Sequence, residues 1–534
     1  MAKKTAGKGS YDIVVIGAGN AAFSSALAAH QAGARVAVLE AATKEMRGGN
    51  TRFTGGLFRF TYHNVEEIER MLGDNDDTST IEFDPYSAED YLNDIDRVTR
   101  GKYDPELINI LISESFPTVC WLADNGIPFS FYRLPNLKIP GTNKHKLQFG
   151  AGFEVKGRGS LLSDRWFEIA EKQGIKVFYE TQAVELLQDA KGRVSGVRAH
   201  DRNGNVEFRA KAVILGSGGF QSNPEMRTAY MGPAWSMVKV RGTRFNTGLM
   251  TRAALGIGAQ GVGQWAGAHA TPLDNDAGDY GHLEATDETS RVSYPLGLMV
   301  NLDGQRFADE GEDFKLYTYA KTGAKILDQK YGVIFQIFDK KTTPLLEKRY
   351  GTGKPETADT LEALAEKISQ RSGDMGFNKS QFLKSVAEFN TAVGETEFDP
   401  MIKDGKHTSG LAVDKTNWAQ RIDQAPYVAY PITTGITFTF GGLKINGDAQ
   451  VVDLLGRDIP GLYATGEVTG GFFYYNYPGG AGLMRGAVFG RRAGTNAAKY
   501  AAGSAKKPAA KSKQNKPRSA KGKPAKKKAV RGKR

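Results

Sequence analysis

The stretch that decides the fold is Tyr11-Asp-Ile-Val-Val-Ile-Gly-Ala-Gly-Asn-Ala-Ala22, followed by Ala34-Arg-Val-Ala-Val-Leu-Glu40. Its apolar run Ile-Val-Val-Ile is typical of a buried parallel strand. Gly17 permits a tight turn, and Gly19 lets the backbone approach a pyrophosphate at the start of a helix. Glu40 falls roughly 20 residues further on, where an acid binds a ribose hydroxyl. Together these features predict a nucleotide-binding βαβ unit.

A second nucleotide signature, Ile459-Pro-Gly-Leu-Tyr-Ala-Thr-Gly-Glu467, lies near the other end of the chain. The first segment alone is typical of many nucleotide-binding proteins. The pair points to a flavoprotein whose FAD is held by both ends of the chain. We therefore predict an α/β protein with a Rossmann-like FAD-binding domain.

Composition excludes several other classes of protein. A chain of 534 residues is too long for one simple core, so two domains are expected. The single cysteine, Cys120, excludes a disulfide framework and a cysteine-ligated iron–sulfur cluster within this chain. The seven histidines show no metal-ligand spacing, and we predict no metal. Without a signal-peptide pattern or a long apolar stretch, the sequence favours a soluble cytoplasmic protein.

The net charge of +12 belongs to the end of the chain. Residues 501–534 carry 14 Lys and Arg and no Asp or Glu, which leaves 57 basic and 59 acidic residues in the rest. A segment rich in Ala, Lys, Pro and Ser cannot bury a core and is expected to be disordered. It is either a solvated appendage or a contact for nucleic acid or anionic lipid.

The pattern between the two nucleotide segments indicates a discontinuous domain. Strand patterns occur at Ile175–Glu180, Val194–Ala199, Val206–Arg209 and Ala212–Leu215, and the turn at 201–205 predicts a hairpin. Residues 62–130 have a polar, helical pattern, and from about 270 to 430 helices and loops mix without a nucleotide signature. We predict a polar N-terminal arm over 1–10, an FAD-binding domain over 11–269 and 431–500, an inserted α+β capping domain over 270–430 and a disordered tail over 501–534.

Five motifs follow one another along the chain: GAGNAA at 17–22, GGNT at 48–51, GQRFADE at 304–310, IPGLYATGEVTGG at 459–471 and VFGRRAG at 488–494. Together they resemble the fumarate reductase/succinate dehydrogenase flavoprotein superfamily. Within it, RGGNT at 47–51, ADEGEDFKLYTYAK at 308–321 and YYNYPGGAGLMRGAVFGRRAG at 474–494 are most similar to tricarballylate dehydrogenase, which uses FAD to oxidise a propane tricarboxylate to cis-aconitate.

The resemblance implies roles for the cofactor-binding residues. Glu467 is expected to bind the ribityl chain, and the turn at 479–484 to aim backbone amides at the flavin. Succinate dehydrogenases carry a flavin-linking histidine near the position of Asn50, whose side chain cannot form that bond, so we expect non-covalent FAD. The predicted cofactor-binding residues are Gly17, Gly19, Asn20, Ala21, Glu40, Gly49, Asn50, Thr51, Gly55, Gly56, Val184, Gly218, Gly466, Glu467, Gly482 and Leu483.

Three departures from the superfamily pattern concern the substrate. Tyr319 stands where fumarate reductases place a proton-shuttling arginine, and Tyr477 stands where they place a carboxylate-binding arginine. A histidine expected just before Gly441 is also missing. His269 does match a substrate-binding histidine. These losses make plain fumarate or succinate chemistry a poor fit.

Desaturation next to a carboxylate needs a base for the α-proton, flavin N5 as hydride acceptor, and donors that hold the developing enolate. Tyr319 is the candidate base, with Tyr317 or Lys321 as neighbours able to lower its pKa from about 10. His269 is expected to orient a carboxylate, and Tyr477 to lie over the flavin or substrate. Each of these three side chains could instead serve only in packing.

A polycarboxylate also needs cationic clamps, for which arginine is best suited. Arg485 is the first candidate because it follows the flavin-facing glycines, and Arg59 and Arg244 come next. Arg47, Arg52 and Arg241 also lie near flavin-proximal motifs.

The leading hypothesis is an FAD-dependent dehydrogenase of a small carboxylate that passes its electrons to a separate, membrane-associated partner, as the resemblance implies. A 3-ketosteroid dehydrogenase-type desaturase and a fumarate reductase-like enoate reductase are the enzymatic alternatives. Convergent arginines in the pocket would favour a carboxylate, and a long apolar pocket a steroid. A non-catalytic flavoprotein tethered by its basic tail is the third class.

Overall fold

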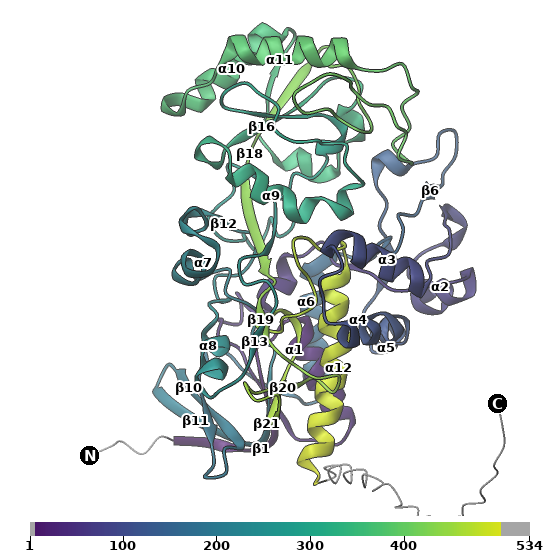
Figure 1. Ribbon diagram of the computed structural model, residues 1–534. Helices are drawn as coiled ribbons and strands as arrows, with labels where there is room; N and C mark the ends of the chain where they lie inside the picture. The colour runs from purple at the N-terminus through teal and green to yellow at the C-terminus, as the bar shows by residue number, and fades with distance from the viewer. Residues whose placement is uncertain (1–5, 504–534) are drawn as a thin grey trace, which may run out of the picture.

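The computed structural model describes residues 6–503, which form a nucleotide-binding part and a cap above it (Figure 1). The nucleotide-binding part is built on an eight-stranded sheet in which β1, β2, β8, β11 and β21 are parallel. The order is β20-β21-β11-β1-β2-β8, and β9 and β10 continue from β11. The strands are β1 (Ala6–Ile16), β2 (Val36–Leu39), β8 (Lys176–Phe178), β9 (Gln182–Gln188), β10 (Val194–Asp201), β11 (Gly204–Leu215), β20 (Gln450–Val452) and β21 (Asp458–Ala464).

The first and last helices of the described chain pack side by side on this sheet (Figure 1). These are α1 (Asn20–Gln31) and α12 (Ala481–Ala501). Gly490 and Gly494 of α12 make the close approach possible. A Cβ atom at Gly490 would lie 2.7 Å from Ser24 Cβ, and one at Gly494 would lie 2.2 Å from the Ser25 carbonyl oxygen. The two ends of the sequence are therefore locked together around one core.

Two predicted boundaries in this part are corrected by the structure. Residues 6–10, predicted as a polar arm, extend β1, and Ala6 pairs with Val206. The strands predicted at 206–209 and 212–215 are one strand, β11, because its pairing with β1 continues through both runs. The predicted hairpin is present, with Asp201 opposite Gly204.

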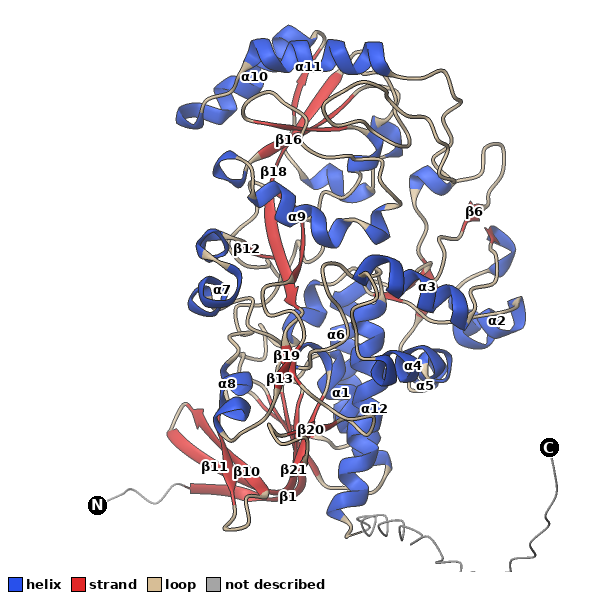
Figure 2. Cartoon of the chain, viewed as in Figure 1, coloured by secondary structure: helices blue, strands red, loops and turns tan. Residues whose placement is uncertain are grey.

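The predicted helical region, 62–130, contains four α-helices, of which α4 and α5 pack against α12 (Figure 2). Two small sheets join this region to the segments around it. The elements are β3 (Leu57–Phe58), α2 (Val65–Leu72), β4 (Ile81–Glu82), α3 (Ala88–Thr99), α4 (Pro105–Ser113), α5 (Ser115–Asp124), β5 (Phe129–Phe131), β6 (His145–Lys146), β7 (Phe153–Val155) and α6 (Arg158–Lys172).

The cap is built on a six-stranded sheet in the order β12-β18-β16-β15, with β14 and β17 also paired to β18. The long strand β18 runs from the cap toward the nucleotide-binding part (Figure 2). β12 and the start of β14 precede residue 270, so this sheet recruits residues from before the predicted boundary. The elements from β12 to β18 that build the cap are β12 (Lys239–Val240), β14 (Ala268–Asp274), β15 (Leu298–Asn301), α9 (Tyr319–Leu327), β16 (Ile334–Phe338), β17 (Glu356–Ala358), α10 (Leu361–Ser372), α11 (Lys379–Ala392) and β18 (Tyr427–Thr439), and α7 (Pro224–Met231) lies beside them. Three further elements, α8 (Leu249–Gly256), β13 (Gly261–Val262) and β19 (Gly442–Leu443), lie with the nucleotide-binding part (Figure 1).

Within residues 6–503, no helix combines the length and apolar character needed to cross a bilayer. The predicted disorder of the basic tail concerns residues that, from 504 onward, lie outside the described part of the chain. Residues 501–503 belong to the end of α12 and the turn that follows it.

Candidate active site

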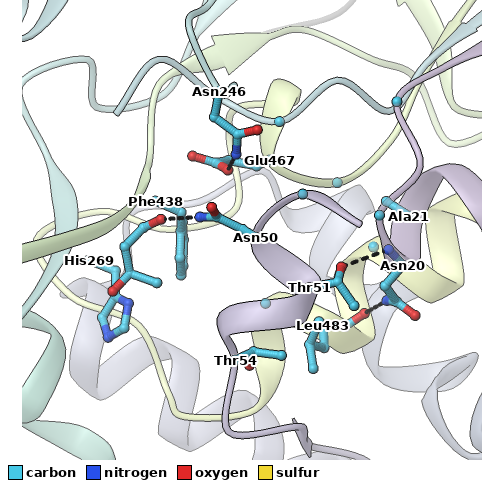
Figure 3. Close-up of a pocket in the computed structure, with 18 of the residues that line it drawn as sticks. Asn20, Ala21, Asn50, Thr51, Thr54, Asn246, His269, Phe438, Glu467 and Leu483 are labelled. Carbon is cyan, nitrogen blue, oxygen red and sulfur yellow. Dashed lines mark hydrogen bonds between the residues drawn. The ribbon is translucent and has the colours of Figure 1, made fainter. Parts of the chain in front are cut away.

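A deep cavity lies where β1, β2 and β11 end and α12 begins (Figure 3). Its wall combines residues 16–21 and 39–41 with residues 216–218, 466–467 and 480–486. Segments from both ends of the sequence therefore line one space. The cap covers the far end of this cavity with residues of β14, α9 and β18.

Asn20 joins the two ends of the chain at this cavity (Figure 3). Its backbone N–H donates to Thr51 Oγ1 at 2.8 Å, and its side-chain Nδ2 donates to the Leu483 carbonyl at 3.0 Å. Its Oδ1 accepts a hydrogen bond from Trp166 Nε1. Because all the groups of this amide are engaged, Asn20 fixes the start of α1 against the start of α12.

The shape and polarity of the cavity fit FAD. Gly19 precedes α1 and Gly480 precedes α12, and as glycines neither can cap its helix with a side chain of its own. Gly17 has φ 98°, and a Cβ there would lie 2.4 Å from the Gly216 carbonyl oxygen, so this turn requires glycine. The two helix starts offer backbone N–H groups to anionic ligand atoms. The α1 start suits the pyrophosphate, and the α12 start suits the flavin ring.

Two acids mark the two ends of the nucleotide site. Glu40 is buried directly after β2 and accepts a hydrogen bond from the Ala42 N–H, and burial raises the pKa of its carboxyl. Glu467 accepts from the Thr439 N–H at 2.9 Å and from the side-chain amide of Gln221 at 3.1 Å. Burial raises the pKa of Glu467 to about 7. Both carboxylates line the cavity, as expected for groups that bind sugar hydroxyls.

Asn50 lies in the cavity wall between Glu467 and Phe438 (Figure 3). Its Nδ2 donates to the Thr437 carbonyl at 2.6 Å, and its Oδ1 accepts from the Thr243 N–H at 2.9 Å. The amide thus bridges the nucleotide-binding loop and the strand that leads into the cap. The Asn50 side chain therefore stabilises the cavity wall. Because it is an amide and has no imidazole, it cannot form a histidine-type covalent bond to the flavin.

Most of the predicted cofactor-binding residues line the cavity, and two lie outside its wall. Gly56 lies against the start of α6, where a Cβ would meet the Arg158 backbone. Val184 follows residues 181–183, which line the cavity, and the wall ends before it. The predicted residues in the wall are Gly17, Gly19, Asn20, Ala21, Glu40, Gly49, Asn50, Thr51, Gly55, Gly218, Gly466, Glu467, Gly482 and Leu483.

Three of the predicted catalytic residues meet at the cap end of the cavity. The hydroxyls of Tyr319 and Tyr477 are hydrogen-bonded at 2.6 Å. The His269 ring lies 4.7 Å from the Tyr319 ring and 5.0 Å from the Tyr477 ring, between centroids. Neither ring nitrogen of His269 has a hydrogen-bond partner among residues 6–503. Burial, with the nearby Arg241, holds the pKa of His269 well below its ordinary value, so the imidazole is neutral.

The neighbours predicted for Tyr319 are wrong. Tyr317 does not face the cavity; its hydroxyl donates to Asp94 at 2.7 Å. Lys321 pairs with Glu312 on the exposed side of α9. Burial and the adjacent Tyr477 raise the pKa of Tyr319 well above 10 instead of lowering it. Tyr319 is therefore protonated at neutral pH.

Three basic side chains line the cap side of the same cavity: Arg241, Lys315 and Arg349. Burial and the neighbouring Arg349 lower the pKa of Lys315 well below its ordinary value, and Glu347 forms an ion pair with it. Arg241 pairs with Asp287 and donates from Nε to Ser290 Oγ at 2.7 Å. Arg349 Nη1 lies 3.0 Å from the other carboxylate oxygen of Asp287. Burial alone would raise the pKa of Asp287, but the surrounding arginines outweigh it and hold the carboxyl ionised.

The arginines singled out in the sequence are spread over several places. Arg485 lines the cavity near Glu467, and its guanidinium lies 5.1 Å from the centroid of the Phe473 ring. Burial lowers the pKa of Arg485 to about 10. Arg59 is fully buried outside the cavity wall, where it donates to Asp94 at 2.7 Å. The others, Arg47, Arg52 and Arg244, lie over Phe167, beside Asp164 and over Tyr280.

Sequence reasoning missed two of the three cap-side cations. Lys315 lies within the motif at 308–321, but the residues of this motif predicted to be catalytic were Tyr319 and Tyr317. Arg349 lies in a short turn of the cap that carries no motif. Only the folded cap brings Arg349 to Asp287, which is 62 residues away in the chain.

Comparison with known proteins agrees with this geometry. The family model described as FAD binding domain matches residues 12–483. The chain is 30% identical over 504 residues to a probable fumarate reductase of Shewanella frigidimarina, covering 92% of this chain and 75% of that protein. The protein therefore belongs to the FAD-binding-domain family, in the fumarate reductase/succinate dehydrogenase superfamily. It is an FAD-dependent oxidoreductase that acts on carbon–carbon bonds.

Solved structures show the same fold. A flavocytochrome c3 fumarate reductase in its open conformation superposes with a TM-score of 0.67 at 27% identity, covering 93% of this chain and 79% of that one. A 3-ketosteroid Δ1-dehydrogenase from Sterolibacterium denitrificans gives a TM-score of 0.68 at 20% identity, covering 92% and 99%. At that identity the second likeness concerns the fold alone.

Proposed function

We propose that this oxidoreductase dehydrogenates, or in reverse reduces, a C–C bond next to a carboxylate of a small polycarboxylate of the tricarballylate type. The observation that carries the proposal is the group of cations Arg241, Lys315 and Arg349 in the cavity wall, close to the tyrosine pair and to His269. Convergent cations are the feature that favours a carboxylate over a steroid.

Bound FAD supplies the acceptor for the hydride. The protein must hold the carboxylates, move one proton and exclude water. Tyr319 takes the α-proton in its ionised form, and the Tyr477 hydroxyl, 2.6 Å away, donates a hydrogen bond that stabilises this phenolate. His269, with both ring nitrogens unpaired, can donate one hydrogen bond to a substrate carboxylate.

The ion pairs that these basic side chains form within the protein are compatible with binding a substrate carboxylate. Asp287 lies between Arg241 and Arg349, and Glu347 pairs with Lys315. A substrate carboxylate can accept from the outward N–H groups of these cations while the internal acids keep the buried charge balanced. The basic side chains can therefore bind an anionic substrate, and they remain paired with acids when no substrate is bound.

A 3-ketosteroid-type desaturation is the second candidate. It is favoured by the tyrosine pair, since Tyr319 and Tyr477 both replace arginines of the carboxylate-specific relatives. Reduction of an enoate, as the name of the Shewanella relative suggests for that protein, would use the same residues in reverse. Electrons would pass to or from a separate partner protein, and we propose a cytoplasmic location for this chain.

The test is to mix the oxidised holoenzyme anaerobically with tricarballylate, succinate and a 3-ketosteroid, and to follow the flavin absorbance. Bleaching by tricarballylate is the expected result. Bleaching by the steroid alone would overturn the carboxylate proposal. Reoxidation of the dithionite-reduced enzyme by fumarate or cis-aconitate tests the reductive direction.

A further inference from the structure

A second hollow lies beside the flavin cavity, between the nucleotide-binding part and the cap. Residues 130–135, Glu154, Lys156 and Arg158 form one wall, and Glu347 and Lys348 of the cap form the other. We call this hollow the vestibule. Tyr132 lines both the vestibule and the flavin cavity, so the two spaces meet at this side chain.

One cluster of contacts closes the passage between the two spaces. Lys315, which lines the flavin cavity, donates to the Tyr132 hydroxyl at 3.1 Å and pairs with Glu347, which lines the vestibule. Tyr132 Oη lies 3.3 Å from Glu347 Oε2. The three side chains are nearly buried and belong to two different parts of the fold. Because the partner of Lys315 is a carboxylate, another carboxylate can take its place without leaving the cation unpaired.

The charges of the vestibule favour anions. Lys156 and Lys348 are exposed on opposite walls, and neither forms an ion pair with any residue that the structure describes. By contrast, Arg133 is engaged by both carboxylate oxygens of Asp76. Burial raises the pKa of the Glu154 carboxyl to about 7, so this acid opposes anions less below that pH than above it.

We propose that the vestibule is the access route for the anionic substrate, with Lys156 and Lys348 collecting it and the Tyr132–Lys315–Glu347 contact acting as an inner gate. This inference rests on the proposed function, which makes the substrate a small polyanion. In passing the gate, a substrate carboxylate replaces Glu347 as the partner of Lys315 and is delivered toward Arg349, whose Nη2 already lies 3.4 Å from the Tyr132 hydroxyl.

The test uses sulfite at pH 8, a small anion that bleaches bound flavin on reaching it and is unrelated to the proposed substrate. The variant is Lys156→Ala/Lys348→Ala in the holoenzyme. The matched control is Lys172→Ala/Lys176→Ala, which removes the same charge from exposed positions at the far end of α6, roughly 20 Å from its vestibule end. The readout is the second-order rate constant of bleaching in stopped-flow at low and high salt.

Two lysines facing a divalent anion at roughly 10 Å are expected to raise the association rate about fivefold at low salt and little at high salt. The variant should therefore bleach about fivefold more slowly at low salt, and the control should match the wild type. Ser130→Trp, which fills the vestibule, should slow bleaching at every salt concentration. Equal rates in all proteins would overturn the access route. If the bleaching rates follow the expected pattern but none of the carboxylates reduces the flavin, the proposed function would be refuted instead.

Discussion

Replacing Tyr319 by phenylalanine removes one hydroxyl from the cap end of the cavity and leaves the ring in place. In the wild type this hydroxyl shares a 2.6 Å hydrogen bond with Tyr477 and lies beside the neutral imidazole of His269. If Tyr319 carries the proton, the change affects the chemical step and leaves FAD binding intact, because the FAD-binding glycines lie elsewhere in the wall.

The magnitude follows from the role of the hydroxyl. Loss of a positioned acid–base group lowers kcat about 10²- to 10⁴-fold. The free energy of unfolding should fall by only about 1–3 kcal/mol, since one buried hydroxyl of Tyr477 loses its partner. The pKa of Tyr319 lies well above 10, so the ionised fraction rises with pH. The wild-type dehydrogenation rate should therefore increase with pH, and the Tyr319→Phe rate should not.

The assay is single-turnover flavin reduction by tricarballylate between pH 6 and 10, with flavin content and thermal unfolding measured in parallel. Tyr317→Phe is the matched control, because it removes a tyrosine hydroxyl two residues away that donates to Asp94 outside the cavity. This control should keep the wild-type reduction rate. Retention of more than about a tenth of the wild-type rate by Tyr319→Phe, with the pH dependence unchanged, would refute Tyr319 as the proton carrier.

The remaining predictions concern binding, stability, the cofactor and the tail. Arg349→Met should raise KM for a carboxylate about tenfold to a hundredfold in steady-state assays, while Arg241 still pairs with Asp287. Glu154 has a pKa of about 7 when folded and roughly 4.3 when unfolded, so the folded state binds its proton more tightly. Wild-type stability should therefore fall relative to Glu154→Gln as pH rises between these values, by at most about 4 kcal/mol in denaturant titrations. Acid precipitation should release all of the FAD into the supernatant, whereas colour in the pellet would indicate a covalent link. Deleting residues 504–534 should leave turnover and flavin content unchanged but abolish any binding to DNA or anionic vesicles in a pull-down assay.

The nucleotide site could be predicted from the sequence because its chemistry is local. A tight turn, a close approach to a pyrophosphate and a helix start each require particular residues at fixed spacing, so Gly17, Gly19 and Glu40 carry their own signal. The cavity wall includes residues 181–183 and ends before Val184, and spacing along the chain does not set where a strand leaves the cavity. The continuity of β11 could not be predicted either, since its two halves are joined by pairing with β1.

The sequence by itself determined that the chain binds FAD with both of its ends and belongs to a superfamily of flavoproteins that act on carbon–carbon bonds. Only the tertiary structure decided which polar groups share the cap end of the cavity. The fold places Tyr319 in the cavity wall and Tyr317 outside it, and it brings Lys315 and Arg349 into the same wall. The physical reason is that these contacts join residues far apart in the chain, and whether a cation meets an acid, a ring or a substrate depends on how the cap closes over the sheet. No spacing rule along the chain encodes that arrangement.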